Sequence, residues 1–324
     1  MRAAIEVRAI GQRTRSGAVT LRDVTLAVGH SELVAIIGGS ESGKGALLDA
    51  MSGLRPPSSG IVARSASTIG YVPKGDTVDP AVPLARALRY TARLRAVPRP
   101  RDAVAAALRE LDLSARSGVS AGELPGGERK RAAIAAELLA SPALFFLDEP
   151  TDGLEPARGR ELMRTLRGLI DRGVTVVLTT QSPLDAEHCD KVAVLATGGH
   201  LAFFGTPEAA RGYFGADSLE EIFERLAGPG DPAEAWSRRF FQFYRTVNGA
   251  SVPSVPPQRG RTPLVPDTAG PHSAGAPGPV GPPGRDPASA DESPDGQAAD
   301  PVAGEPAGVA GPDGAAGEAA RDGA

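Results

Sequence analysis

The stretch LPGGERKRAAIAAELLASPALFFLDEPTDGLE, residues 124–155, decides the fold. It predicts a helix that begins at two glycines, then a turn, and then an apolar strand over 144–147. The strand residues do not alternate with polar ones, which is typical of a central strand covered on both faces. Two carboxylates, Asp148 and Glu149, follow directly after it. Ligands bind at the carboxyl ends of strands in open parallel sheets, so we expect these acids to handle a metal ion and water. Two acids that merely cap a strand end are the alternative.

A second motif lies upstream, where residues 38–44 read GGSESGK, a G-x4-G-K pattern. An apolar strand over 33–37 precedes it, and a helix over 46–53 follows it. Further strands are predicted over 5–8, 18–21 and 24–28, and the prolines within 97–100 predict a break between two helices over 84–111. Backbone N–H groups at a helix start, together with the Lys44 amine, can cradle a triphosphate. A glycine-rich strand-to-helix turn without a ligand is the alternative.

The composition divides the 324-residue chain into two parts. After residue 249 the chain is rich in proline, glycine and alanine and contains no aromatic residue. We therefore expect residues 249–324 to be a disordered tail. The net charge of −4 arises from acidic residues of this tail, so it says little about a partner of the preceding part.

The single cysteine and the absence of long apolar runs bear on location. Cys189 is the only cysteine, so no internal disulfide can form and a reducing compartment is expected. No apolar run approaches the roughly 18 residues of a membrane span, and the N-terminus lacks a signal-peptide core. We expect a cytoplasmic protein whose membrane-spanning partner, if it serves transport, is another polypeptide.

In this order, the two motifs resemble those of the ATP-binding subunit of ATP-binding cassette (ABC) transporters. The letters GGERKRAAIAAELL are most similar to the signature helix of white/ABCG-type exporters. The resemblance covers residues 1–226 and implies an α/β fold, the P-loop NTPase ABC cassette. Such a cassette has a RecA-like core, an antiparallel β subdomain and a helical subdomain, here at about 76–135. The aromatic helical extension over 227–248 either lies at a membrane interface or on a permease, or packs back onto the domain.

The resemblance also assigns roles to the residues of these motifs. It implies that Asp148 holds Mg²⁺ through water, that Glu149 polarises the attacking water, and that Gln181 stands at the position of the switch histidine. Gly126 and Gly127 begin the signature helix, which caps the γ-phosphate of ATP held by the opposite subunit. The residues implied to bind ATP within the chain are Gly38, Gly39, Ser40, Glu41, Ser42, Gly43, Lys44, Gly45, Ala46 and Lys74.

Four positions depart from the family pattern. Gly45 replaces the Ser or Thr whose hydroxyl binds Mg²⁺, so we expect a weakened metal site. Lys74 replaces the glutamine of the Q-loop and is either a solvated lysine or a positive charge that partly replaces magnesium at the γ-phosphate. Pro125 removes the signature serine but fits the first position of the helix, and neutral Gln181 cannot shuttle a proton. Residues 8–20 contain no aromatic side chain to stack on adenine.

The function that the sequence favours is the ATP-binding subunit of an ABC-type exporter. It would couple ATP binding, and slow or impaired hydrolysis, to transport by a separate permease at the inner face of the cell membrane. The expected partners are ATP, an integral-membrane permease subunit and a second cassette in a homodimer or heterodimer; nucleic acid is not expected. One alternative is a non-hydrolysing regulatory or scaffold cassette that pairs with an intact partner. Another is a soluble cassette in signalling or translation, against which the single cassette counts.

Overall fold

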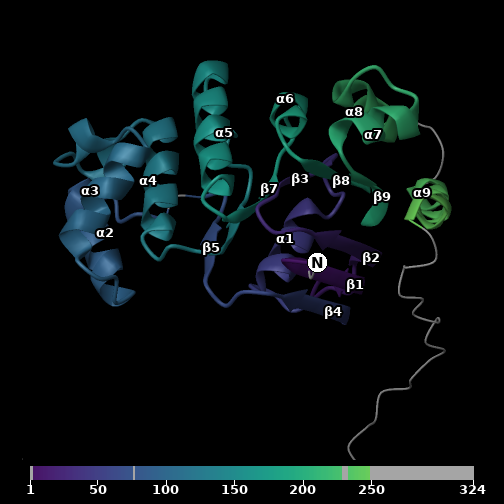
Figure 1. The fold of residues 1–324 in the computed structure, drawn as a ribbon, viewed down its shortest axis with the longest axis horizontal. Coiled ribbons are helices and arrows are strands. Elements are labelled where there is room, and N and C mark those ends of the chain that lie inside the picture. The colour runs from purple at the N-terminus through teal and green to yellow at the C-terminus, as the bar shows by residue number, and fades with distance from the viewer. Residues whose placement is uncertain (1–2, 76, 228–232, 249–324) are drawn as a thin grey trace, which may run out of the picture. The chain divides into compact units, whose positions relative to one another are not determined.

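The computed structural model describes residues 3–75, 77–227 and 233–248 (Figure 1). The predicted tail over 249–324 lies outside the described residues. The strands are β1 (Ile5–Arg13), β2 (Val19–Val28), β3 (Leu33–Gly38), β4 (Ser59–Arg64), β5 (Ile69–Val72), β6 (Leu144–Leu147), β7 (Thr175–Thr179), β8 (Lys191–Ala196) and β9 (His200–Gly205). The helices are α1 (Lys44–Ser52), α2 (Leu84–Leu94), α3 (Pro100–Glu110), α4 (Gly126–Leu138), α5 (Pro156–Ile170), α6 (Pro183–Glu187), α7 (Pro207–Phe214), α8 (Leu219–Ala227) and α9 (Ala233–Asn248).

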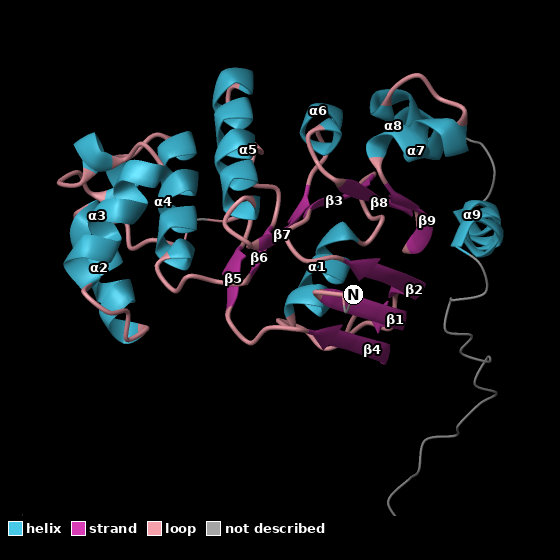
Figure 2. Cartoon of the chain, viewed as in Figure 1, coloured by secondary structure: helices cyan, strands magenta, loops and turns pink. Residues whose placement is uncertain are grey.

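Within these residues, nine strands form a mixed sheet in the order β4-β1-β2-β9-β8-β3-β7-β6-β5. The strands β5, β6, β7, β3 and β8 are parallel, whereas β1, β2 and β4 are antiparallel to one another. Every residue of β3, β6 and β7 is buried, as the apolar runs without alternation predict. Figure 2 shows the loops that leave this parallel part of the sheet, and these loops carry the predicted motifs.

The predicted helical subdomain consists of separate helices. The Val97–Pro100 region breaks the chain as expected, and Pro100 becomes the first residue of α3. Apolar side chains at helical spacing, such as Leu88 on α2 and Leu108 on α3, are buried where the two helices pack on each other. Helix α4 packs on both of them and on β5, so it joins the helical subdomain to the edge of the parallel sheet.

Two boundaries differ from the sequence-based prediction. The separate strands expected over 18–21 and 24–28 are one strand, β2, because the β1–β2 register shifts near Asp23 and the strand continues through the irregularity. Asp23 adopts a positive φ of 49°, which permits such a bulge. Helix α1 begins at Lys44 rather than at residue 46, so the lysine belongs to its first turn.

The aromatic helix α9 packs back onto the domain. It lies against β9, and Phe240 is only 2% exposed. The Phe240 ring lies 5.6 Å from that of Phe203 on β9, and Trp236 lies 4.9 Å from Phe214 on α7. Of the two interpretations of this helix, the structure agrees with packing on the domain.

Candidate functional site

The phosphate loop connects β3 to α1 and holds the Lys44 side chain against its own backbone. The Lys44 Nζ donates to the carbonyl oxygens of Gly38 at 2.8 Å and Gly39 at 2.9 Å, and the residue is 8% exposed. Burial lowers the pKa of Lys44, while the charges of Glu149 and Asp148 act in the opposite direction. The amine is therefore fixed at the mouth of the loop and faces the two acids.

Gly43 and Glu41 are two of the residues of this loop that have a positive φ. Gly43 has a φ of 90°, and a Cβ there would lie 2.3 Å from the carbonyl oxygen of Thr20, so only glycine fits. Glu41 has a φ of 65°, a conformation that strains a residue with a side chain. Its side chain is exposed. A residue with a Cβ at this position therefore strains the loop.

The acids Asp148 and Glu149 leave the end of β6 beside the end of β7. Thr179, the last residue of β7, donates its hydroxyl to Asp148 Oδ1 at 2.6 Å. The same hydroxyl oxygen accepts from the Glu149 N–H at 2.8 Å. Thr179 thus orients both acids. The sequence analysis did not identify it, although a polar residue at the end of an apolar strand was a usable signal.

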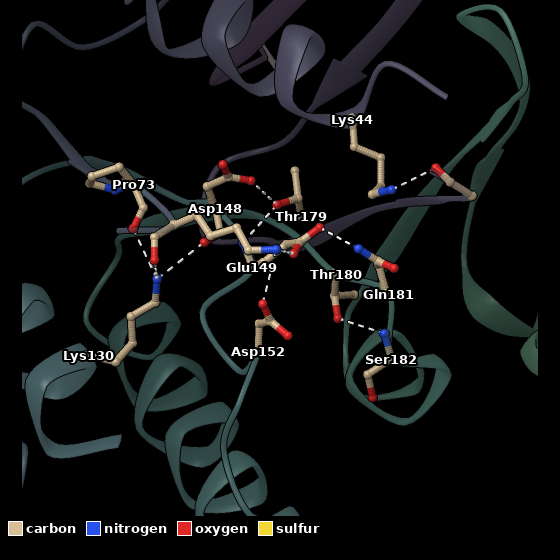
Figure 3. Close-up of polar contacts among 12 residues, drawn as sticks. Lys44, Pro73, Lys130, Asp148, Glu149, Asp152, Thr179, Thr180, Gln181 and Ser182 are labelled. Carbon is tan, nitrogen blue, oxygen red and sulfur yellow. Dashed lines mark hydrogen bonds and ion pairs between the residues drawn. The ribbon is translucent and has the colours of Figure 1, made fainter. Parts of the chain in front are cut away.

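Both carboxylate oxygens of Glu149 are engaged by side chains (Figure 3). The Lys74 Nζ lies 2.5 Å from Oε2, and the Gln181 Nε2 donates to Oε1 at 2.8 Å. The same Lys74 amine lies 3.0 Å from Asp152 Oδ2. The structure therefore brings three predicted site residues together and adds Asp152. The sign of its charge, opposite to that of Lys74, was the only signal for it in the sequence.

These contacts change the acid–base properties of Glu149. Partial burial acts against its ionisation, but hydrogen bonds from Lys74 and Gln181, together with the Lys74 and Lys44 charges, hold its pKa below the usual range. Hydrogen bonds to the carboxylates of Glu149 and Asp152 in turn raise the pKa of Lys74. Both groups are therefore charged at neutral pH. A carboxylate with a lowered pKa is a weaker general base, and here each of its oxygens already has a side-chain partner with which a water must compete.

Lys130, on the signature helix α4, extends to the carboxyl ends of two strands. Its Nζ donates to the carbonyl oxygens of Pro73 at 3.0 Å, Lys74 at 3.1 Å and Asp148 at 3.4 Å, and the residue is 7% exposed. These bonds tie the helical subdomain to the backbone that carries Lys74 and the acids. Nothing in the sequence pattern distinguished this lysine from the neighbouring arginines.

The signature glycines lie at the start of α4, beside the loop that follows the acids. Pro125 is the residue before the helix rather than its first residue as predicted, because its ψ of 152° is extended, and Gly126 begins the helix. An open pocket of about 320 Å³, the signature pocket, is lined by Pro125, Gly126, Gly127, Glu128, Arg131, Gly153, Leu154, Glu155 and Arg158. No phosphate-loop residue lines it. The structure therefore does not bring Gly126 and Gly127 together with Lys44 within one chain.

The side chains around the acids fit a magnesium ion poorly. Gly45 supplies no hydroxyl, although a Cβ there would meet no atom within 4 Å. Of the three carboxylates, Glu149 and Asp152 hold the Lys74 ammonium, and one oxygen of Asp148 holds Thr179. Among the described residues, no group of three or more His, Cys, Asp and Glu side chains could hold a metal ion. A divalent cation would have to displace or approach an ammonium group.

A second pocket, of about 650 Å³, lies beside α1. It is lined by Gln12, Arg13, Thr14, Arg15, Thr20, Ala46, Asp49 and Arg55. This lining contains no aromatic ring, in agreement with the lack of an aromatic residue over 8–20. The helices that the structure describes include none with the length and apolar character needed to cross a membrane.

Comparisons with known proteins give one family. The family model described as "ABC transporter" matches residues 21–152. The ABC transporter ATP-binding/permease protein Rv1747 of Mycobacterium tuberculosis is 37% identical over 239 residues, 68% of this chain and 28% of that protein. ATP-binding cassette sub-family G member 5 of Mus musculus is 34% identical, with 60% of this chain and 33% of that protein covered. This chain thus spans about a third of these two relatives or less.

Other similar proteins are matched over nearly their whole length. The thiamine import ATP-binding protein ThiQ of Brucella suis is 31% identical over 242 residues, 66% of this chain and 98% of that protein. A solved structure of an ATP-binding subunit of an ABC transporter superposes with a TM-score of 0.62 at 24% identity, over 69% of this chain and 100% of that one. The cassette fold, the order of the motifs and these similarities agree. The chain belongs to the family of ABC transporter ATP-binding proteins.

Proposed function

We propose that this protein is the ATP-binding subunit of an ABC-type exporter and that it hydrolyses ATP slowly while a separate permease moves the substrate. The observation that carries the proposal is the arrangement of the Lys44 amine opposite Asp148 and Glu149 (Figure 3). Glu149 is already held by Lys74. Phosphate binding needs the Lys44 amine, and hydrolysis needs Asp148 and Glu149 to be accessible.

The similarity to sub-family G proteins supports the direction of transport. Several relatives carry ABCG names, and the M. tuberculosis relative is named as an ATP-binding/permease protein. The importer subunit ThiQ is similar at a comparable identity, so the cassette itself suits either direction. The exporter assignment rests on the ABCG-like sequence over the signature helix. A permease at the cell membrane and a second cassette complete the proposed assembly.

Slow hydrolysis follows from the contacts that this site lacks. A hydroxyl at Gly45, a glutamine at Lys74, a serine at Pro125 and a histidine at Gln181 are absent. If each contributes about 1–3 kcal/mol to transition-state stabilisation, their sum corresponds to a rate loss of about a thousandfold or more. Groups that act together do not contribute additively, so the expected loss is smaller than this sum. The ion pair between Lys74 and Glu149 acts in the same direction, because an attacking water must replace a charged partner.

A non-hydrolysing regulatory cassette is the second candidate. It is favoured because both carboxylate oxygens of Glu149 are already held, one by Lys74 and the other by Gln181. In that case a catalytically intact cassette would pair with this chain and supply turnover. The phosphate loop would still bind ATP, and occupancy of the site would report the nucleotide state to the permease.

The two candidates differ in the turnover of the purified full chain and of its Glu149→Gln variant. For the motor we expect ATP binding by both proteins, slow turnover by the wild type and none by Glu149→Gln. Glu32→Gln is a matched control, because Glu32 also pairs with a lysine, Lys191 at 2.6 Å, beside the amino ends of β3 and β8. Binding without turnover would favour the regulatory cassette. Absence of binding would refute both.

A further inference from the structure

The position of Lys74 has a consequence for the metal ion that nucleotides usually carry. The ammonium group lies between Glu149 Oε2, at 2.5 Å, and Asp152 Oδ2, at 3.0 Å. It therefore occupies one oxygen of each of two carboxylates that could otherwise face a divalent cation. The Lys74 side chain is 56% exposed, so it is not locked in this place and can turn toward a ligand at the same edge.

The other groups at this edge also work against a divalent cation. Gly45 removes the hydroxyl from the first turn of α1, in a place where a Cβ would fit without contact. One carboxylate oxygen of Asp148 accepts a hydrogen bond from the Thr179 hydroxyl, at 2.6 Å. Mg²⁺ keeps several waters but needs protein oxygens near ideal octahedral positions, and a neighbouring ammonium group repels it.

The positive charges at this edge come from the chain itself. Lys44 lies at the phosphate loop, Lys74 lies between two carboxylates, and the Lys130 amine is bonded to the backbone oxygens of Lys74 and Asp148. These three amines balance the charge of the three carboxylates, Asp148, Glu149 and Asp152, without a metal. An ammonium group can form charge-assisted hydrogen bonds with phosphate oxygens, as Mg²⁺ would bind them.

We propose that this cassette binds its nucleoside triphosphate without Mg²⁺, and that the Lys74 ammonium takes the place of the metal at the terminal phosphate. The inference rests on the proposed function, because it requires that the phosphate loop binds ATP. On binding, Lys74 moves from Glu149 to the phosphate oxygens, while Gln181 keeps its bond to Glu149. Asp152 remains within reach of the same amine and limits how far it moves.

The test is ATP affinity, measured by equilibrium dialysis of labelled ATP with the purified full chain, in excess Mg²⁺ and in EDTA. We expect the wild-type Kd to change less than about threefold between the two conditions. In Lys74→Gln, we expect the Kd in EDTA to rise about tenfold to a hundredfold, because a charge-assisted contact is lost. The double variant Lys74→Gln with Gly45→Ser restores the hydroxyl and should bind ATP more tightly with Mg²⁺ than in EDTA.

Lys191→Gln is the matched control, because it removes a lysine paired with a glutamate outside this site. It should leave the affinity unchanged in both conditions, and thermal unfolding verifies that each variant is folded. Wild-type affinity that falls about threefold or more in EDTA overturns the inference but leaves the proposed function intact. Metal-independent binding that Lys74→Gln does not weaken overturns the role of Lys74. Absence of binding in both conditions overturns the proposed function itself.

Discussion

At Glu149, one carboxylate is the candidate base and also the partner of an ammonium group. Its position after β6 is the one expected for a residue that polarises water, yet Lys74 and Gln181 hold both of its oxygens. Two properties of the residue therefore oppose each other. The contacts that stabilise the charged carboxylate also make it a poorer proton acceptor.

The lowered pKa of Glu149 predicts a defined pH dependence of stability. Because the folded-state pKa lies below the unfolded value of about 4.3, the carboxylate stabilises the fold above that value and loses this effect as the pH falls through its folded pKa. We expect the unfolding temperature of the wild type to exceed that of Glu149→Gln by a constant amount from neutral pH to about pH 5. The difference should shrink once the pH falls below the unfolded value of about 4.3, and it should be lost as the pH falls through the lower folded pKa. Glu41→Gln, at an exposed carboxylate, is the control; thermal unfolding monitored by circular dichroism measures both.

The strained residue of the phosphate loop gives a second prediction at this scale. Relief of the left-handed strain at Glu41 should gain about 1–2 kcal/mol, and the greater freedom of unfolded glycine removes about 0.5–1 of it. Glu41→Gly should therefore raise the free energy of unfolding by about 0.5–1 kcal/mol, measured in urea. Ser40→Gly, next to it but without a positive φ, should lower it. Equal losses in both variants would show that Glu41 is unstrained.

At the scale of elements, strands deliver the functional groups and helices connect them. The phosphate loop follows β3, the two acids follow β6, and Thr179 is the last residue of β7. Residues 180–182 continue the chain from the end of β7. Helix α4 contributes its amino end to the signature pocket and the Lys130 amine to the strand ends. A displacement of α4 would therefore move the residues of the signature pocket and the backbone next to the acids at the same time.

The contact between α9 and β9 gives a prediction for one element. Phe240 is 2% exposed and packs on Phe203, whereas Phe243 on the same helix is 41% exposed. We expect Phe240→Ala to lower the free energy of unfolding by about 3–5 kcal/mol, and Phe243→Ala by less than half as much. Urea unfolding followed by tryptophan fluorescence measures both, because Trp236 lies in the same cluster. A loss below about 1 kcal/mol for Phe240→Ala would mean that α9 does not pack on β9.

At the scale of the whole molecule, the separation of the signature pocket from the phosphate loop predicts assembly. The two groups of residues that we propose to contact ATP lie apart in one chain, so in this proposal a second cassette placed head to tail completes the site. We expect ATP to convert the Glu149→Gln chain from monomer to dimer in sedimentation velocity. Gly126→Asp, which adds a carboxylate at an open position in the signature pocket, should keep it monomeric while it still binds ATP. A Glu149→Gln chain that stays monomeric in ATP contradicts the homodimer and favours a heterodimer.

Much of the fold could be read from apolar runs and glycine positions, because these report burial and turns directly. The strands before Gly38 and Asp148, the break near Pro100 and the helix after the signature glycines were all predicted and lie where expected. The pairing of Lys74 with Asp152 was not predicted, because the two residues lie on loops whose paths depend on tertiary packing. The Lys130 contacts were not predicted for the same reason: its partners are three backbone carbonyl oxygens, which every residue has, so the residue types do not indicate them.

The strand order also affects the synthesis of the protein. β3 ends at Gly38, but its neighbours β7 and β8 are complete only at Thr179 and Ala196, so roughly 160 residues separate the phosphate loop from the last of its supports. At about 5–20 residues per second on a ribosome, this interval lasts roughly 8–30 s. Until β7 is complete, the apolar residues of β3 have neither partner strand and offer an edge for wrong pairing. A nascent chain thus acquires its nucleotide site only after most of the cassette has been made, and ATP cannot assist the early steps of folding.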